Sequence, residues 1–178
     1  MVSFIKTWYN AFHIIIKEML MLLETEKSYI AGLVDGEGCI YIDKYKDKRN
    51  KSGNYNYCLR VSIANTFFGL MEWLGNKLSK EYHNHVLNQK GKEYINGRKP
   101  CYVWKICGTN AINFLKEIYP YLIIKKKQCE KAFEFSETHF DNAKRDRKGK
   151  FSKLPNELLE KKEKIHKEIK DLNQRREM

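Results

Sequence analysis

Two glycines, Gly32 and Gly36, constrain this chain most, because they stand four residues apart in a segment that otherwise reads as a helix. Residues four apart lie on the same face of a helix. Without side chains on that face, two such helices can approach until their backbones nearly touch. The segment 30–38 therefore predicts a helix that can pack very closely against another helix of this kind. The residues expected at such a contact, and hence at a dimer interface, are Ala31, Gly32, Asp35 and Gly36.

Two acids, Asp35 and Glu37, stand at the C-terminal end of this expected helix. The helix dipole disfavours negative charge at that end, so an acid held there without a cation is a cost. A divalent metal would reverse the sign. Two Glu37 carboxylates from paired helices, with a nearby carbonyl such as that of Gly36, offer the hard oxygen ligands that Mg²⁺ uses. Taken alone, residues 35–38 have a plainer reading as a glycine-capped helix end with two exposed acids.

The whole segment 30–38, IAGLVDGEG, resembles the LAGLIDADG motif at nearly every position, with Glu37 in place of the final Asp. The resemblance implies an α+β fold of order αββαββα, whose four-stranded antiparallel saddle lies in the DNA major groove. It also implies a homing endonuclease that uses Mg²⁺ or Mn²⁺, with Ca²⁺ as a non-catalytic substitute. The chain holds one motif, and single-motif members act as homodimers on nearly palindromic targets. The expected reaction hydrolyses two phosphodiesters across the minor groove and leaves 3′ overhangs.

Two further stretches resemble single-motif members of the family. Residues 61–66 look like the place where the family has a polar residue that positions water and metal, here Asn65. Residues 119–128 look like the segment before the last core helix, where a lysine near the scissile phosphate matches Lys125. A solvated basic turn is the alternative for this lysine. Residues 67–69 depart from the pattern, because the family often has Arg or Lys there.

Hydrophobic periodicity and turn residues predict the same element order without the motif. The expected helices lie at about 25–38, 67–78, 111–119 and 121–139, and the strands at 39–45, 55–64, 86–90 and 100–106. Pro155 opens a further, highly charged helix. We expect an N-terminal helical extension at 1–24, an endonuclease core at 25–142, and a basic linker with the charged helix at 143–178.

Composition narrows the class of partner. The 178 residues include 34 Lys and Arg against 22 Asp and Glu, a net charge of +12, so a polyanion is the partner to consider. Five cysteines without a C-x-x-C pair indicate reduced intracellular thiols rather than disulfides or a zinc site. Lys17 and Glu18 interrupt an apolar run before it reaches membrane-spanning length. An organelle and a bacterial or phage cytoplasm both remain open as the compartment.

Polar and basic side chains dominate the two expected strand pairs, with Asp43, Asp47 and Glu93 as the acidic exceptions. Strands in this family read base edges with alternate side chains. For each residue singly, a solvated outer sheet face is the plainer interpretation. The expected DNA-binding residues are Tyr41, Lys44, Lys46, Lys48, Arg49, Asn54, Asn56, Arg60, Ser62, Gln89, Lys90, Lys92, Arg98, Lys99, Tyr102 and Lys105.

Two rival functions share this fold. A maturase would bind the RNA of its host intron, and a regulator would bind DNA without cutting it. Glu37, retained in an otherwise complete motif, favours the nuclease. A regulator usually needs an added recognition module, whereas the residues after Pro155 read as a single charged helix.

Overall fold

The computed structural model describes residues 22–46, 55–79, 82–88, 100–140 and 155–174. The expected N-terminal helix falls almost wholly outside these ranges, as do the basic linker and the tips of both strand pairs. The elements in chain order are α2 (Glu24–Glu37), β1 (Gly38–Lys46), β2 (Tyr55–Asn65), α3 (Phe68–Leu78), β3 (Asn84–Asn88), β4 (Tyr102–Cys107), α4 (Gly108–Ile118), the 3-10 turn η1 (Tyr119–Tyr121), α5 (Lys126–Phe140) and α6 (Asn156–Gln174).

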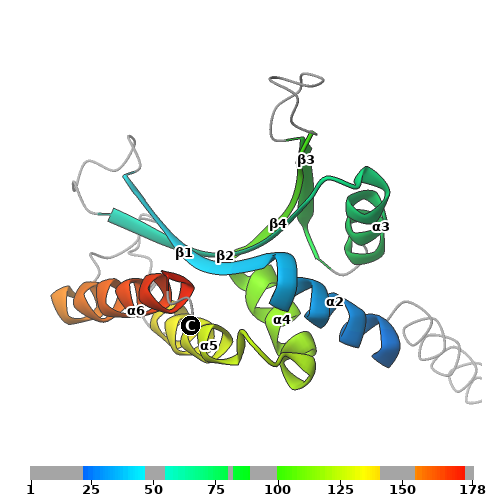
Figure 1. Ribbon diagram of the computed structural model, residues 1–178. Coiled ribbons are helices and arrows are strands. Elements are labelled where there is room, and N and C mark those ends of the chain that lie inside the picture. The colour runs from blue at the N-terminus through cyan, green and yellow to red at the C-terminus, as the bar shows by residue number, and fades with distance from the viewer. Residues whose placement is uncertain (1–21, 47–54, 80–81, 89–99, 141–154, 175–178) are drawn as a thin grey trace, which may run out of the picture.

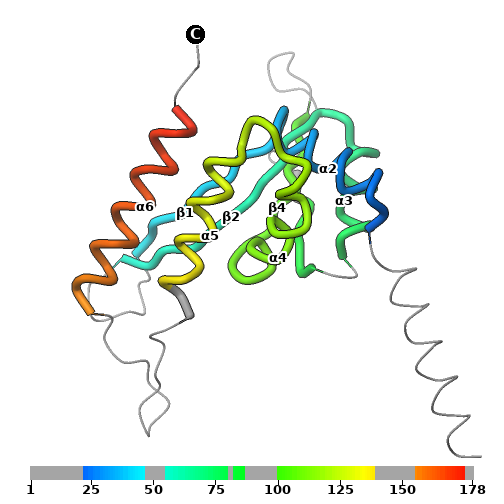
Figure 2. The backbone as a smooth tube through the Cα atoms, turned by 90° about the horizontal axis from the view of Figure 1, so that it is seen from below, coloured from blue at the N-terminus to red at the C-terminus, as the bar shows by residue number. Residues whose placement is uncertain are grey.

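The predicted order αββαββα is confirmed, and so is the α+β class. The four strands form one antiparallel sheet in the order β1-β2-β4-β3. The sheet curves so that its two strand pairs rise on either side of a concave face (Figure 1). Helices pack along the other, convex side, and none of the described helices lies over the concave face (Figures 1 and 2).

Strand alternation decides which side chains face the helices. Ile40 and Ile42 of β1 are buried, as are Leu59, Val61 and Ile63 of β2. Successive side chains of a strand point to opposite faces, so the residues between them face the concave side. Trp104 of β4 continues the helix-facing layer with no exposed surface, and its ring centre lies 5.2 Å from that of Phe114 in α4.

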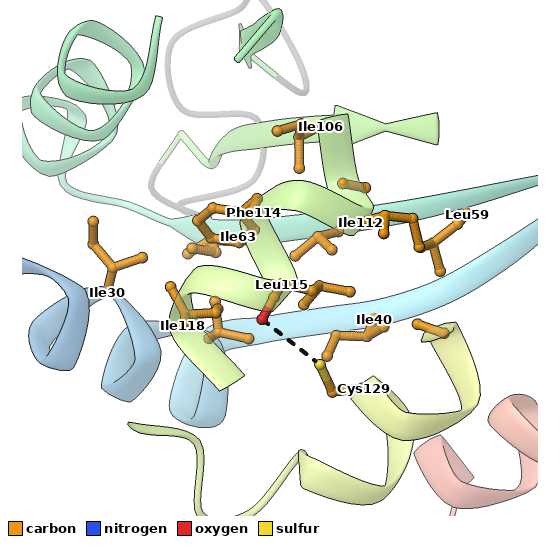
Figure 3. Packing of buried hydrophobic residues seen from close by; sticks show 14 of the residues in the cluster. Ile30, Ile40, Leu59, Ile63, Ile106, Ile112, Phe114, Leu115, Ile118 and Cys129 are labelled. Atoms are coloured by element: carbon orange, nitrogen blue, oxygen red, sulfur yellow. Dashed lines mark hydrogen bonds between the residues drawn. The ribbon is translucent and has the colours of Figure 1, made fainter. Parts of the chain in front are cut away.

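The core lies between the sheet, α2, α4 and α5 (Figure 3). Ile30, Phe114, Leu115 and Ile118 belong to it and have no exposed surface. At its floor the thiol of Cys129 donates to the carbonyl of Leu115, and burial raises the pKa of this thiol to about 12. This packing fixes α2 against the sheet, and α2 carries the motif.

The charged C-terminal helix α6 packs on the core against β1 and α5, with Ile165 and Ile169 buried. It also binds the open edge of β1. The amide of Asn173 donates to the carbonyl of Ile40 at 2.9 Å, and Nδ1 of His166 lies 3.0 Å from the carbonyl of Ile42. Unpaired edge-strand groups invite pairing with other chains, so these contacts protect the edge.

Among the described helices, none combines the length and the apolar character needed to cross a membrane.

Candidate active site

The motif helix α2 turns one side into the core. Ile30, Ala31 and Val34 have no exposed surface. The sequence placed Ala31 at the dimer interface. The structure corrects this, because Ala31 is fully buried in the core of its own protomer. The helix begins at Glu24, one residue before the predicted start, and the Glu26 carboxylate accepts the Leu23 N–H at 2.9 Å there.

The motif glycines fall into two kinds. A Cβ on Gly38 would lie 2.5 Å from the carbonyl oxygen of Val34, so the close passage from α2 into β1 requires glycine there. A Cβ on Gly32 or Gly36 would meet nothing within 4 Å, and both residues are exposed. Nothing within the described protomer therefore requires glycine at these two positions.

Asp35 joins the motif to the segment before α5. Its carboxylate is almost buried and accepts the backbone N–H groups of Ile123 at 2.7 Å, Ile124 at 3.2 Å and Lys125 at 2.9 Å. The sequence placed Asp35 at the dimer interface, whereas in the structure its carboxylate binds within its own chain. Only the backbone of Asp35 therefore remains available for a dimer interface.

Lys125 is held at the end of the motif helix. Its ammonium group donates to the backbone carbonyl of Asp35, two residues before Glu37. A cation is favourable at a helix C-terminus. Lys125 also affects Cys39, at the start of β1. Burial raises the pKa of the Cys39 thiol, and the positive charge of the nearby Lys125 opposes that rise. The motif and the lysine matched by resemblance are thus brought together.

Glu37 ends α2 with its side chain exposed. In the described ranges its carboxylate forms no hydrogen bond or ion pair, and the last turn of α2 holds no basic residue of its own. A carboxylate beside helix-end carbonyls is a donor set that a divalent cation fits. The described part of one protomer nevertheless holds no group of three or more His, Cys, Asp or Glu placed to bind a metal.

Asn65, the third expected catalytic residue, ends β2 and has a local role. Its side-chain oxygen accepts the N–H of Phe67 at 2.8 Å at the start of α3. Such a turn orders the entry into a helix. Asn65 shares this end of the sheet with the motif, because Ile63 pairs with Gly38, the residue after Glu37.

Five of the expected DNA-binding residues lie on the concave face. The register places Tyr41 opposite Arg60, and Ser62 opposite Lys105. Asn56 shares the face, since it alternates in step with Arg60 on β2. All five are partly exposed. The concave face also carries residues that the sequence did not single out for binding. These include Cys39, Asp43, Cys58, His85 and Cys107.

Three expected DNA-binding residues lie on the helix side of the sheet rather than on the concave face. Lys44 stands two residues after the buried Ile42, so it points to the helix side, where its ammonium group lies 2.7 Å from a Glu163 carboxylate oxygen of α6. Lys46 lies on the same side, 5.1 Å above the Tyr55 ring. Tyr102 packs against α3, with 4.9 Å between its ring centre and that of Phe68. Charge and polarity suggested these residues, but strand alternation overrules both.

The remaining expected DNA-binding residues lie outside the described ranges. They are Lys48, Arg49, Asn54, Gln89, Lys90, Lys92, Arg98 and Lys99.

Solved structures share this architecture over most of the chain. The homing endonuclease I-CvuI, in complex with DNA in the presence of Mg, aligns with a TM-score of 0.65 and 14% identity, covering 87% of this chain and 86% of that one. The archaeal intron-encoded homing endonuclease I-Vdi141I, complexed with DNA, aligns with a TM-score of 0.63 and 17% identity, covering 84% of each. The chain has the LAGLIDADG homing-endonuclease fold.

Other structures with the LAGLIDADG fold are about twice as long. The chain covers 45% of the I-LtrWI LAGLIDADG homing endonuclease bound to target DNA, at 20% identity and a TM-score of 0.56, while 83% of this chain is covered. One copy of this chain therefore matches about half of such a protein. No protein-family model and no curated protein matches the chain.

Proposed function

We propose that this chain is a site-specific endonuclease that cuts double-stranded DNA as a homodimer. It would hydrolyse two phosphodiesters across the minor groove of a long, nearly palindromic target and leave 3′ overhangs. The observation that carries the proposal is the exposed Glu37 carboxylate, which has no partner among the described residues, at the end of a helix whose glycine face is open. The structural neighbours support it, since several are homing endonucleases in complex with DNA.

The dimer follows from the open glycine face. Gly32 and Gly36 lie four apart, where the described protomer places nothing within 4 Å of an added Cβ. A second copy of the same helix fits such a face, because small residues let two backbones approach closely. A symmetric pair would bring the two α2 ends, and with them the two Glu37 carboxylates, to one place.

The metal would be held by these carboxylates together with backbone carbonyls such as that of Gly36. Mg²⁺ or Mn²⁺ fits hard oxygen donors, and Ca²⁺ would bind without supporting the reaction. The structures of I-CvuI in complex with DNA were obtained in the presence of Mg or of Ca. When bound, Mg²⁺ supplies the Lewis-acid chemistry that stabilises charge developing on a phosphate.

The remaining groups belong to this chain. Lys125, anchored on the Asp35 carbonyl, would neutralise charge on the scissile phosphate. Asn65 would help to orient water from the end of β2. The concave face would enter the major groove, where Tyr41, Arg60 and Lys105 can reach base edges.

The test is cleavage of a randomised duplex library by the purified chain, in Mg²⁺ and in EDTA, beside the Glu37→Gln variant. We expect metal-dependent cuts at one long, nearly palindromic sequence. Glu37→Gln should lower cleavage at least about 1,000-fold, because several kcal/mol of transition-state stabilisation is lost. Binding of the same duplex should persist, since the fold does not depend on Glu37.

Glu72→Gln is the matched control, because Glu72 is another exposed helical glutamate, on α3. It should cut like the wild type. Full cutting by Glu37→Gln would refute the assignment of that residue. Binding without cutting in every metal would favour the regulator, and intron RNA would then be the ligand that tests for the maturase.

A further inference from the structure

Asp43 is the single acid among the described residues of the concave face. Its neighbours there are neutral or basic, with Tyr41 and Cys39 on β1 and Arg60 on β2. A carboxylate on a surface that meets the phosphate polyanion weakens binding to any DNA sequence. Its presence on this face therefore needs a reason other than affinity.

The pairing of the strands brings Asp43 to Arg60. Tyr41 lies opposite Arg60, and Asp43 lies opposite Cys58, so Asp43 and Arg60 are diagonal neighbours on one face. Asp43 Oδ2 lies 3.1 Å from Arg60 Nε. Side-chain exposure is 32% for Arg60 and 41% for Asp43, so both side chains of the ion pair remain partly accessible from the solvent.

Arg60 is central on the face. It lies on β2, an inner strand, with Tyr41 opposite on β1 and Cys107 opposite on β4. Nε is buried and has no hydrogen-bond partner among the described residues, and the Asp43 carboxylate holds it through an ion pair, with Oδ2 at 3.1 Å. In the described ranges no hydrogen bond occupies the two terminal guanidinium nitrogens, so they are free to bind a ligand.

The chemistry of the guanidinium decides which ligand fits. The group is planar and carries five N–H donors in a fixed fork. When a carboxylate holds Nε, the two terminal nitrogens remain as a pair of parallel donors. Guanine presents two acceptors, O6 and N7, side by side in the major groove, and an arginine fork is their commonest partner.

We infer that Asp43 is a positioning residue that orients Arg60 to read one guanine in each half-site of the target. This inference rests on the proposed DNA-binding function. It assigns a specificity role to the acid that interrupts the basic face, and it predicts one base pair of the target.

The experiment is a binding selection from a randomised duplex library in Ca²⁺, with wild type, Arg60→Lys and Asp43→Ala. The wild type should select guanine about 10-fold or more over other bases at one position of each half-site. Arg60→Lys keeps the charge but not the fork, so it should lose that preference alone. Asp43→Ala should weaken the same preference by about 10-fold while non-specific DNA binding stays equal or tightens.

Glu134→Gln is the matched control, since it breaks a different ion pair, Lys131–Glu134 on α5, at 2.8 Å and with similar exposure. Its base preferences should equal those of the wild type. Asp43→Asn, which keeps the side-chain volume, replaces Asp43→Ala should the latter not fold, as checked by thermal unfolding.

The outcomes separate the two claims. A wild type that selects no duplex contradicts the proposed function and the inference together. A wild type that selects a target whose base preferences Arg60→Lys leaves unchanged contradicts the inference alone. The same holds if Arg60→Lys erases a guanine that the Asp43 variants read at full strength.

Discussion

The two sides of the motif helix α2 differ in how much of their sequence one protomer explains. On the inward side, Ala31 and Val34 fill the core, and Asp35 binds three backbone N–H groups. At position 38 only glycine fits against the backbone of Val34. On the outward side, Gly32, Gly36 and Glu37 meet nothing in the described protomer that requires them.

The difference separates folding from function within nine residues. The inward residues are what any helix needs when it packs under a sheet and turns sharply into a strand. The outward residues make a helix less stable, because glycine in a helix interior costs about 1 kcal/mol relative to alanine. Their use is therefore to be sought outside the protomer, in a second copy, a cation and DNA.

The largest expected effect is on the outward side. Gly36→Leu should raise the dimer dissociation constant by at least about 100-fold, because an over-packed contact costs about 1–3 kcal/mol and occurs twice in a symmetric pair. The protomer itself should become slightly more stable, since a poor helix former is replaced. Sedimentation measures the first effect and denaturant unfolding the second.

Glu160→Leu, at an exposed helical position on α6, serves as the control for that substitution. It should leave the association unchanged. A Gly36→Leu protein that dimerises like the wild type would contradict the placement of the outward glycines at a dimer interface.

On the inward side, Gly38→Ala should destabilise the protomer by about 3 kcal/mol, because the new methyl group would overlap the Val34 backbone. Urea unfolding measures the loss. A stable Gly38→Ala protein would mean that the passage from α2 into β1 can relax, and the two kinds of motif glycine would no longer be distinct.

Asp35→Asn should cost about 2 kcal/mol of stability, because N–H groups that now bind a charged carboxylate would face a neutral amide. It should also slow cleavage more than it weakens DNA binding, since the backbone N–H of Lys125 binds the same carboxylate. Single-turnover cleavage and binding titrations separate the two. Equal losses in both would contradict a positioning role.

The smallest effect is a pH dependence on the helix side of the sheet. Hydrogen bonds from Lys44 and then Tyr57 lower the pKa of Glu163 below its usual 4.5. A lowered carboxyl pKa contributes stability above the unfolded pKa, and this is lost as pH falls through the folded value. Stability of the wild type should therefore drop more below about pH 4.5 than that of Glu163→Gln, measured by unfolding at each pH. Equal slopes would contradict it.

Much of this molecule could be predicted from sequence. Periodicity gave the element order, and the motif placed Glu37 at a helix end beside open glycines. The errors on the strands share one cause, since Lys44 and Tyr102 were chosen by polarity, although each stands two residues from a buried side chain, Ile42 or Trp104, and so faces the helix side. The buried Ile40 and Ile42 were the signal that could have corrected Lys44.

Contacts between distant segments of the chain could not be predicted from the sequence. The Asp35 contacts span about ninety positions of the chain, from the motif to Ile123 and Lys125. The contacts of α6 with Lys44 and the β1 edge join even more distant segments. No local pattern encodes such contacts, because they depend on how the sheet curves and how helices pack beneath it.

In the proposed reaction, two copies of this chain together cut both strands of one duplex. Sequencing of both ends of the selected target after cleavage in Mg²⁺ tests this directly. We expect one break in each strand, placed symmetrically about the centre of the near-palindrome with 3′ overhangs, and none in EDTA. A break in one strand only, scattered breaks, or cutting in EDTA would contradict it.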